Sequence, residues 1–520
     1  MSRTSILLCL LALAIFNQPA HSRGEGKDRE RRMICIPAEV IVDKIRGGML
    51  GQMLGNLNGL PHEMKYYDEP GNVSNYVPAL PDGARTDDDT DFEWVYIYEM
   101  QHRRKALLSS DELQQLWTER MNRGVYCSNL YARYLMDLGL KPPYTGYPTL
   151  NPWGDFNISG QFLCETFGLV APAMPQTAAR IGLNYTTVAI NGEPAQTTQL
   201  FTTMISTAFI EDDVSKILDA GIAAVDKNSK VSRVIGDVRA WQKEYPDNWR
   251  ETRRLLKEKY TLDDDLQRNR NGFELNTGAI MIALLYGNGN FEQSLQIAFN
   301  AGWDADCNAA TVGTIVGVMY GYRKMLESND ANPGWQIVDR YRNTTRDNMP
   351  KDETITSYAD RILEVFEMVN EEQGGERTVR DNQVVFLIPA ERPAPLSRIL
   401  PADKQRKELR MEMEDGIKKD IQQGDRQDRA RAAYFAVCLE LDDEIKRSEP
   451  EAWERACNDL MGYWRVMHEV FHTSNRGKYV KSIIAMRQRF EAAGFQQPAR
   501  SYTLNELFEE TVPWKAPGSK

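Results

Sequence analysis

The sequence predicts an all-α fold, in which a multi-helix globule is followed by a C-terminal helical extension. Long stretches place apolar residues at the three- and four-residue steps of amphipathic helices. Signals for strands are weak, because residues 185–190 alternate poorly and residues 384–388 are one short apolar run. Hydrophobic residues make up 42% of the 520 residues and charged residues 26%, a balance typical of a globular protein and not of a disordered chain.

The N-terminal residues have the pattern of a secretory signal peptide, which we assign to residues 1–22. Arg3 supplies the positive charge, residues 6–16 form the apolar run, and Ala20-His21-Ser22 provides small residues for cleavage. The apolar run is too short for a membrane span, so we expect a secreted or periplasmic protein without one. Export permits disulfides among the six remaining cysteines, although their spacing reveals no pairing.

Glycines at four-residue spacing mark two of the predicted helices, because this spacing puts a smooth stripe on one helix face. Each glycine weakens an isolated helix by about 1 kcal/mol, so the repetition indicates two backbones that pack unusually close. A membrane dimerisation motif is disfavoured, since Arg46, Gln52 and Asn56 interrupt the first stretch and the second is too short for a bilayer. The two stripes are Gly47, Gly51, Gly55 and Gly59, and Gly313, Gly317 and Gly321.

Two aspartate clusters lie far apart in the chain, each before a predicted helix, at residues 92–103 and 309–322. Capping and the helix dipole explain one or two aspartates at a helix start. They do not explain four aspartates within five residues, because neighbouring carboxylates repel one another. Mg²⁺ binds carboxylate and hydroxyl oxygens, so we interpret the clusters as two halves of one metal site. The clusters are Thr86-Asp87-Asp88-Asp89-Thr90-Asp91 and Asp304-Ala305-Asp306-Cys307-Asn308.

Three segments resemble, in the same order, the motifs of the ADP-ribosylglycohydrolase family over about residues 38–325. Members of that family are all-helical, hold Mg²⁺ or Mn²⁺, and hydrolyse the glycosidic bond of ADP-ribose attached to a protein or small molecule. The resemblance therefore implies a metal-dependent glycoside hydrolase. The three segments are residues 43–63, then Thr86-Asp87-Asp88-Asp89-Thr90, and then Gly302-Trp303-Asp304-Ala305-Asp306-Cys307-Asn308.

Carried over residue by residue, the resemblance implies ligands for one or two ions of Mg²⁺, Mn²⁺ or Ca²⁺. In that correspondence Asp306 bridges two ions, and Asp304 binds the second. Glu63 falls where the family has a glutamate beside the metals that serves as an acid/base in some members. The implied metal residues are Thr86, Asp87, Asp88, Asp89, Asp304, Asp306 and Cys307, and the implied catalytic residues are Glu63, Asp88 and Asp304.

The chain departs from the family pattern at three places. The first cluster has one additional aspartate, so Asp88 and Asp89 are an alternative aligned pair. Asn56 stands where the family usually has Asp. Cys307 replaces a Ser or Thr hydroxyl that binds the second ion, and a soft thiol is a poor ligand for a hard cation. We therefore expect the second ion to be weak or absent.

Substrate contacts are expected from aromatic and amide side chains near the two clusters. Trp153 and Asn157 lie in a loop, residues 151–157, whose aromatic and amide groups suit sugar recognition, although packing within the loop explains Trp153 equally well. Trp303 lies inside the third motif and is our third candidate. An exported glycosidase meets glycoconjugates, so we expect a small-molecule or glycan substrate, either an ADP-ribose compound or another sugar conjugate.

The pattern changes after about residue 370, which divides the predicted domains. We assign residues 30–370 to the catalytic domain, the polar and proline-containing residues 371–401 to a linker, and residues 402–520 to a helical C-terminal domain. Two apolar stripes support helices in the last part. They are Trp453, Cys457, Leu460, Trp464, Met467 and Phe471, and then Tyr479, Ile483, Met486 and Phe490.

Two alternative functions deserve comparison. His468-Glu469-Val470-Phe471-His472 has the zinc-protease pattern, in which two histidines one helical turn apart bind Zn²⁺ and the glutamate activates water. A non-catalytic sugar-binding protein on the same scaffold is the other alternative, which Cys307 favours. A formal net charge of −11 argues against a nucleic-acid partner.

Overall fold

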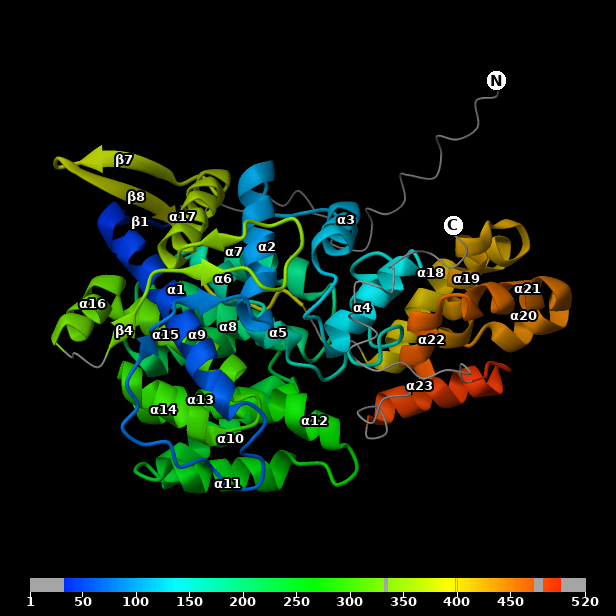
Figure 1. Cartoon of the computed structure of the whole chain (residues 1–520), viewed down its shortest axis with the longest axis horizontal. Coiled ribbons are helices and arrows are strands. Elements are labelled where there is room, and N and C mark those ends of the chain that lie inside the picture. Colours follow the sequence, from blue (N-terminus) through cyan, green and yellow to red (C-terminus); the bar gives the residue numbers. More distant parts are fainter. Residues whose placement is uncertain (1–31, 332–334, 398, 400, 472–479, 497–520) are drawn as a thin grey trace, which may run out of the picture. The chain divides into compact units, whose positions relative to one another are not determined.

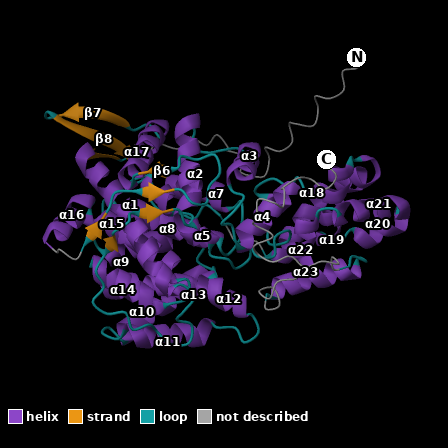
Figure 2. Ribbon diagram, in the orientation of Figure 1, coloured by secondary structure: helices purple, strands orange, loops and turns teal. Residues whose placement is uncertain are grey.

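The structure is a computed structural model that describes residues 32–331, 335–397, 399, 401–471 and 480–496. Helices dominate it, with a few short strands, which confirms the predicted all-α class (Figure 2). The described residues from Met33 onward form one compact unit. Residues 1–22, predicted as a signal peptide, lie outside the described residues. No described helix is long and apolar enough to cross a membrane.

The first half of the described chain is mostly a succession of helices, which follow the strand β1. α10 and α11 are separate helices because Pro246, which lies between them, has no backbone N–H to continue a helix. The elements are β1 (Met33–Pro37), α1 (Ala38–Gly59), η1 (Leu60–His62), α2 (Asp88–Arg103), α3 (Ser110–Arg120), α4 (Cys127–Asp137), η2 (Tyr144–Gly146), α5 (Ser159–Phe162), α6 (Glu165–Leu169), α7 (Pro175–Thr186), α8 (Ala195–Ala208), α9 (Val214–Ala223), α10 (Lys230–Glu244) and α11 (Trp249–Tyr260).

The second half continues with helices to the end of the described residues. α13 ends at Gly287, and Asn288 after it takes the left-handed conformation that commonly terminates a helix. The helices are α12 (Leu266–Asn271), α13 (Phe273–Gly287), α14 (Phe291–Ala301), α15 (Ala305–Tyr320), α16 (Tyr322–Ala331), α17 (Ile355–Glu372), α18 (Ala402–Gln423), α19 (Arg426–Cys438), α20 (Asp442–Ser448), α21 (Pro450–Met461), α22 (Trp464–Phe471) and α23 (Lys481–Ala492).

The two predicted glycine stripes face each other where α1 runs beside α15 (Figure 1). A Cβ atom built on Gly47 would lie 2.5 Å from the carbonyl oxygen of Gly317. Gly51 and Gly313 approach each other more closely still. A Cβ built on Gly51 would overlap the carbonyl oxygen of Gly313, and one built on Gly313 would overlap that of Gly51. Both helices are buried along most of their length. This geometry confirms the prediction of two tightly packed helices.

Short strands complete the fold and were not predicted from the sequence. β1 lies in an antiparallel sheet beside β8 (Gln383–Pro389), which pairs on its other edge with β7 (Glu376–Arg380). The segment predicted as a linker, residues 371–401, therefore contains a β hairpin attached to the N-terminal strand. The remaining strands have two residues each, too few for an alternating pattern to be recognised. They are β2 (Ala79–Leu80), β3 (Ala84–Arg85), β4 (Gln336–Ile337), β5 (Tyr341–Arg342) and β6 (Asp352–Glu353).

These short strands fix the chain that leads into the first aspartate cluster. β2 pairs with β4 and β3 pairs with β5, both in parallel. The amide of Thr86 donates a 2.9 Å hydrogen bond to the carbonyl oxygen of Arg342. The start of α2 is thereby attached to a segment more than two hundred residues further along the chain.

The C-terminal helices pack against α4 and the loop that follows it. The hydroxyl groups of Tyr131 on α4 and Tyr434 on α19 lie 3.0 Å apart, and both side chains are buried. Ser482 on α23 donates its hydroxyl hydrogen to the carbonyl oxygen of Pro152 at 2.6 Å. Both apolar stripes predicted for this region bury residues on α21, α22 and α23, although Tyr479 lies outside the described residues.

We predict that Gly51→Ala destabilises the protein by about 3 kcal/mol or more, because the new methyl group overlaps the backbone of α15 and overpacking of this kind is costly. The matched control is Gly236→Ala on α10, where no atom lies within 4 Å of the new Cβ. That change should stabilise the protein by about 0.5–1 kcal/mol, the difference in helix propensity. Denaturant unfolding of the three proteins measures both effects. Equal stability of the two variants would contradict the close helix packing.

Candidate metal centre

The two aspartate clusters stand at helix starts without acting as helix caps. Asp87 is the N-cap residue of α2 and Asp304 that of α15, and neither side chain makes a capping hydrogen bond. Asp213 shows the contrast, since its carboxylate caps α9 by accepting from the amides of Ser215 and Lys216. Capping therefore does not account for the carboxylates of Asp87 and Asp304.

Oxygen and sulfur atoms from the two clusters converge into two groups that share Asp306. In one group, ligand atoms of Asp89, Asp306 and Cys307 all lie within 4.8 Å of one another. In the other group, Glu63, Asp304 and Asp306 are equally close. The packing of α1 on α15 contributes to this convergence, because a Cβ on Gly59 would lie 2.5 Å from the Cα of Asp306.

The residues present fit a divalent cation. The Oδ1 atom of Asp306 is buried and has no hydrogen-bond partner among the described residues. An unsatisfied buried carboxylate oxygen is costly, and a cation satisfies it. Most atoms of the two groups are carboxylate oxygens, the ligands that Mg²⁺, Mn²⁺ and Ca²⁺ prefer.

The centre gathers several buried carboxylates with too little positive charge nearby to balance them. Burial raises the pKa of Asp89 well above its ordinary value, and the nearby carboxylates of Asp88 and Asp87 raise it further. Burial likewise raises the pKa of Asp306 well above its ordinary value, with further contributions from Asp89 and Asp304. Bringing these groups together therefore costs free energy that a bound cation would offset.

Amide side chains hold the aspartates of the centre in place. Asn56 on α1 donates from Nδ2 to Asp89 Oδ2 at 2.7 Å and to Asp87 Oδ1 at 3.2 Å. Asn271 at the end of α12 donates to Asp304 Oδ2 at 2.7 Å. The sequence marked Asn56 as a departure from the family pattern but gave no indication of Asn271, which lies in a run of polar residues outside the three motifs.

A second segment missed by sequence reasoning supports the first cluster from the side. Thr86 Oγ1 accepts a 2.7 Å hydrogen bond from the amide of Thr344. Arg346 forms a 2.6 Å ion pair with Asp91, and neither side chain is exposed. Burial raises the pKa of Asp91 to about 6 despite this guanidinium. Arg346 thus balances the charge of Asp91, the one aspartate of the first cluster not assigned to the metal.

Cys307 occupies the centre as a neutral thiol. Its Sγ donates to Asp89 Oδ1 at 2.7 Å. Burial, together with the carboxylates of Asp304 and Asp89, raises the pKa of the thiol well above its ordinary value. A neutral thiol is a weak ligand for a hard cation, which agrees with the expectation that this position does not support a second ion.

Glu63 is the exposed member of the centre, and its neighbours explain its position. The amide of Met64 donates to the carbonyl oxygen of Trp303 at 2.9 Å, which holds the Glu63 segment beside Asp304. The Trp303 side chain is buried, and the guanidinium of Arg253 lies 4.5 Å from its ring centroid. Trp303 is therefore a core residue next to the centre in this structure, and its contact with substrate stays a prediction.

The other two substrate candidates are also buried. Trp153 packs against Phe156, with ring centroids 5.7 Å apart. Asn157 Oδ1 accepts hydrogen bonds from the hydroxyl of Ser128 at 3.0 Å and from the amide of Ser159 at 3.1 Å. Both side chains organise the loop after η2, and their contact with substrate likewise stays a prediction.

The zinc-protease hypothesis is not favoured by what the structure describes. His468 is fully buried, and its Nδ1 lies 3.3 Å from the Oε1 atom of Glu469, the glutamate of the motif. The potential metal-binding groups of the described residues include neither of these side chains. His472, the second histidine of the motif, lies outside the described residues.

Two glutamates lie behind the centre in a fully buried polar network. Gln52 donates from Nε2 to Glu93 Oε2 at 2.7 Å and to the carbonyl oxygen of Asp89 at 3.1 Å. The hydroxyl of Thr311 on α15 donates to Glu165 Oε1 at 2.5 Å. Burial raises the pKa of Glu165 to about 7, and burial with the nearby Glu165 carboxylate raises that of Glu93 well above its ordinary value. The network joins α1, α2, α6 and α15.

The chain is similar to a known protein family and to a solved structure. A family model described as ADP-ribosylglycohydrolase matches residues 37–372, which include both aspartate clusters and Glu63. A solved structure described as an ADP-ribosylglycohydrolase-related protein complex is similar to this chain at 14% identity and a TM-score of 0.40, covering 64% of this chain and 99% of its own. No protein of curated function matches the chain.

We predict that Glu165→Gln changes how stability depends on pH. The pKa of Glu165 is raised from 4.5 to about 7 in the folded state, so the folded protein loses stability as pH rises through this range. The glutamine variant lacks this ionisation, and its free energy of unfolding should rise relative to wild type between those pH values.

Denaturant unfolding in EDTA at several pH values measures the difference. Glu244→Gln, at an exposed position on α10, is the control and should keep the wild-type profile. A constant difference between Glu165→Gln and wild type across the range would show that Glu165 ionises as freely in the folded chain as in the unfolded one.

Proposed function

Because this chain belongs to the ADP-ribosylglycohydrolase family, we propose that it is a metal-dependent glycoside hydrolase of that type. Its substrate is an ADP-ribose compound or, if residues 1–22 direct export, another sugar conjugate outside the cytoplasm. The position of Asp306 carries the proposal, since its carboxylate belongs to both groups of ligand atoms and has one buried oxygen without a hydrogen-bond partner among the described residues.

The metal would be held by both aspartate clusters. Asp89, Asp304 and Asp306 supply the convergent oxygens. Thr86, Asp87 and Asp88 lie beside Asp89 at the start of α2. A bound Mg²⁺ or Mn²⁺ supplies Lewis-acid chemistry, because it orients adjacent sugar hydroxyls and stabilises developing charge. Cys307 supplies the weakest of the candidate ligands.

The remaining chemistry falls to carboxylates of the chain. Departure of the aglycone builds positive charge on the sugar ring, as in other glycoside hydrolyses, and the carboxylates of Asp88 and Asp304 stabilise that charge. Glu63 is exposed at the edge of the centre, where it accepts a proton from the attacking water. Asn271 keeps Asp304 oriented through its hydrogen bond.

A hydrolysis screen of the purified protein tests this proposal. ADP-ribosyl substrates, aryl furanosides and aryl pyranosides are offered side by side, each with Mg²⁺ and with EDTA. Mg²⁺-dependent release of a sugar supports the proposal. Metal-dependent sugar binding without turnover would establish the non-catalytic alternative instead, and turnover unaffected by EDTA would exclude the metal.

We predict that Asp306→Asn abolishes tight Mg²⁺ binding and lowers hydrolysis by about 100-fold or more, a typical loss when a charge-stabilising group is removed. The substitution keeps the size of the side chain, so the helical fold should persist. Calorimetric titration with Mg²⁺ and circular dichroism measure the two properties. Asp212→Asn, at an exposed position, is the control and should behave as wild type. Unchanged Mg²⁺ affinity in Asp306→Asn would remove the shared ligand from the proposal.

We predict that the wild-type protein binds one Mg²⁺ tightly and that Cys307→Thr raises the number or affinity of bound ions. A threonine hydroxyl coordinates a hard cation without losing a proton, whereas the thiol of Cys307 is neutral and buried. Cys307→Ala is the matched control, because it removes the thiol without adding an oxygen. Two tightly bound ions in wild type, with no gain in the threonine variant, would contradict this prediction. They would show that the cysteine at position 307 does not weaken the second ion.

A further inference from the structure

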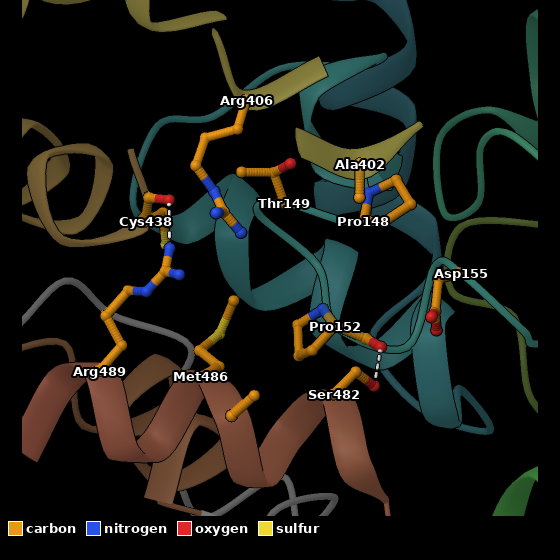
Figure 3. A pocket seen from close by; sticks show the side chains of 11 residues that line it. Pro148, Thr149, Pro152, Asp155, Ala402, Arg406, Cys438, Ser482, Met486 and Arg489 are labelled. Atoms are coloured by element: carbon orange, nitrogen blue, oxygen red, sulfur yellow. Dashed lines mark hydrogen bonds between the residues drawn. The ribbon is translucent and has the colours of Figure 1, made fainter. Parts of the chain in front are cut away.

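A cavity lies where the C-terminal helices meet the loop after η2, and it shares no residue with the metal centre (Figure 3). Its volume is about 190 Å³. A cavity of about 150 Å³ is known to hold benzene, so this one accommodates a substituted ring of similar size. Pro148, Pro152, Ala402, Ala485 and Met486 give the walls a mostly apolar character.

One end of the cavity carries two guanidinium groups from different helices. Arg406 on α18 and Arg489 on α23 reach it from opposite sides (Figure 3). Glu440 Oε1 accepts from both, at 2.9 Å from Arg406 and 2.8 Å from Arg489. One carboxylate between two guanidinium groups leaves this end with a net positive charge.

The donors at this end are not all used. Arg406 Nε is buried and has no hydrogen-bond partner among the described residues. A buried donor left without an acceptor is costly, and a guanidinium prefers an oxyanion as its partner. An anionic group of a ligand therefore fits beside Arg406.

The other end of the cavity has the opposite character. Asp155 lies away from the two arginines in Figure 3, and its Oδ1 is buried without a hydrogen-bond partner in the described part of the chain. Its other oxygen lies 3.8 Å from Arg268, which is too far for a hydrogen bond. An ammonium or other donor of a ligand would satisfy this carboxylate.

We propose that this cavity binds a small zwitterionic organic molecule, with an oxyanion beside Arg406 and Arg489, an apolar body along the proline and methionine walls, and an ammonium group beside Asp155. The two charged ends lie on opposite sides of an apolar middle, so a ligand with only one charge leaves one end unsatisfied. The site is independent of the proposed hydrolase activity, because it uses none of the metal-centre residues.

Calorimetric titration of the full-length protein with three probes of similar size tests the site. 4-(Aminomethyl)benzoate carries both charges, 4-ethylbenzoate lacks the ammonium, and 4-methylbenzylamine lacks the carboxylate. Burial raises the pKa of Asp155 to about 6, so the titrations are made near pH 8, where its carboxylate is ionised. The zwitterion should bind about tenfold more tightly than either partner probe, the usual effect of one charge-assisted hydrogen bond.

Two substitutions locate the binding. Arg406→Gln should weaken both benzoates about tenfold, while Arg410→Gln, one turn along α18 and outside the cavity, should have no effect. Asp155→Asn should remove the advantage of the zwitterion over 4-ethylbenzoate. Asp306→Asn should leave all three probes unchanged, which separates this site from the metal centre.

The proposal is overturned if wild type binds none of the probes, or binds the zwitterion no better than the other two. It is also overturned if Arg406→Gln and Arg410→Gln weaken binding equally, because the loss would then reflect the surface charge of α18 and not the cavity.

Discussion

The contact of α1 with α15 is the constraint on which the rest of the structure depends. Gly47 and Gly51 let the two backbones approach to a distance that no side chain permits, opposite Gly317 and Gly313. The same line of contact ends at Gly59, against the backbone of Asp306. The spacing of the helices therefore also sets the spacing between the Glu63 segment, which follows α1, and the second aspartate cluster, which opens α15.

The candidate metal centre is assembled on this helix pair from segments that are distant in sequence. α2 brings Asp89 to the pair, where Asn56 of α1 donates to it. The two-residue strands β3 and β5 hold the chain that enters α2. Arg346 then balances Asp91, which leaves the remaining carboxylates of the cluster for a cation. Each of these contacts involves only a few residues, and together they fix the first aspartate cluster at the start of α2.

Sequence reasoning predicted the parts of this arrangement that rest on periodicity or on dense motifs. The glycine stripes and the helical class are confirmed, and the family match covers all three motifs. The supports could not be predicted, because Asn271 and Arg346 act through tertiary contacts that leave no local pattern. Strands of two residues are too short to show alternation. Trp153 and Trp303 illustrate the reverse case, since an aromatic residue beside a motif does not reveal whether it faces substrate or the core.

The C-terminal helices are joined to the centre by a short succession of contacts. Ser482 holds Pro152, and the loop that continues from Pro152 pairs at Asn157 with Gly272. Gly272 follows Asn271, whose side chain orients Asp304. The helices beyond residue 402 thus support the loops around the second cluster, and they lie in the same compact unit as the two aspartate clusters.

The central claim is that the two aspartate clusters together form one metal centre. A structure from crystals grown with Mn²⁺ tests this claim most directly. An anomalous difference map identifies manganese without reference to any assumed ligand. The account predicts a peak in contact with Asp306 and with carboxylates of both clusters. A map without a peak at Asp306, or with its only strong peak at His468, would contradict it.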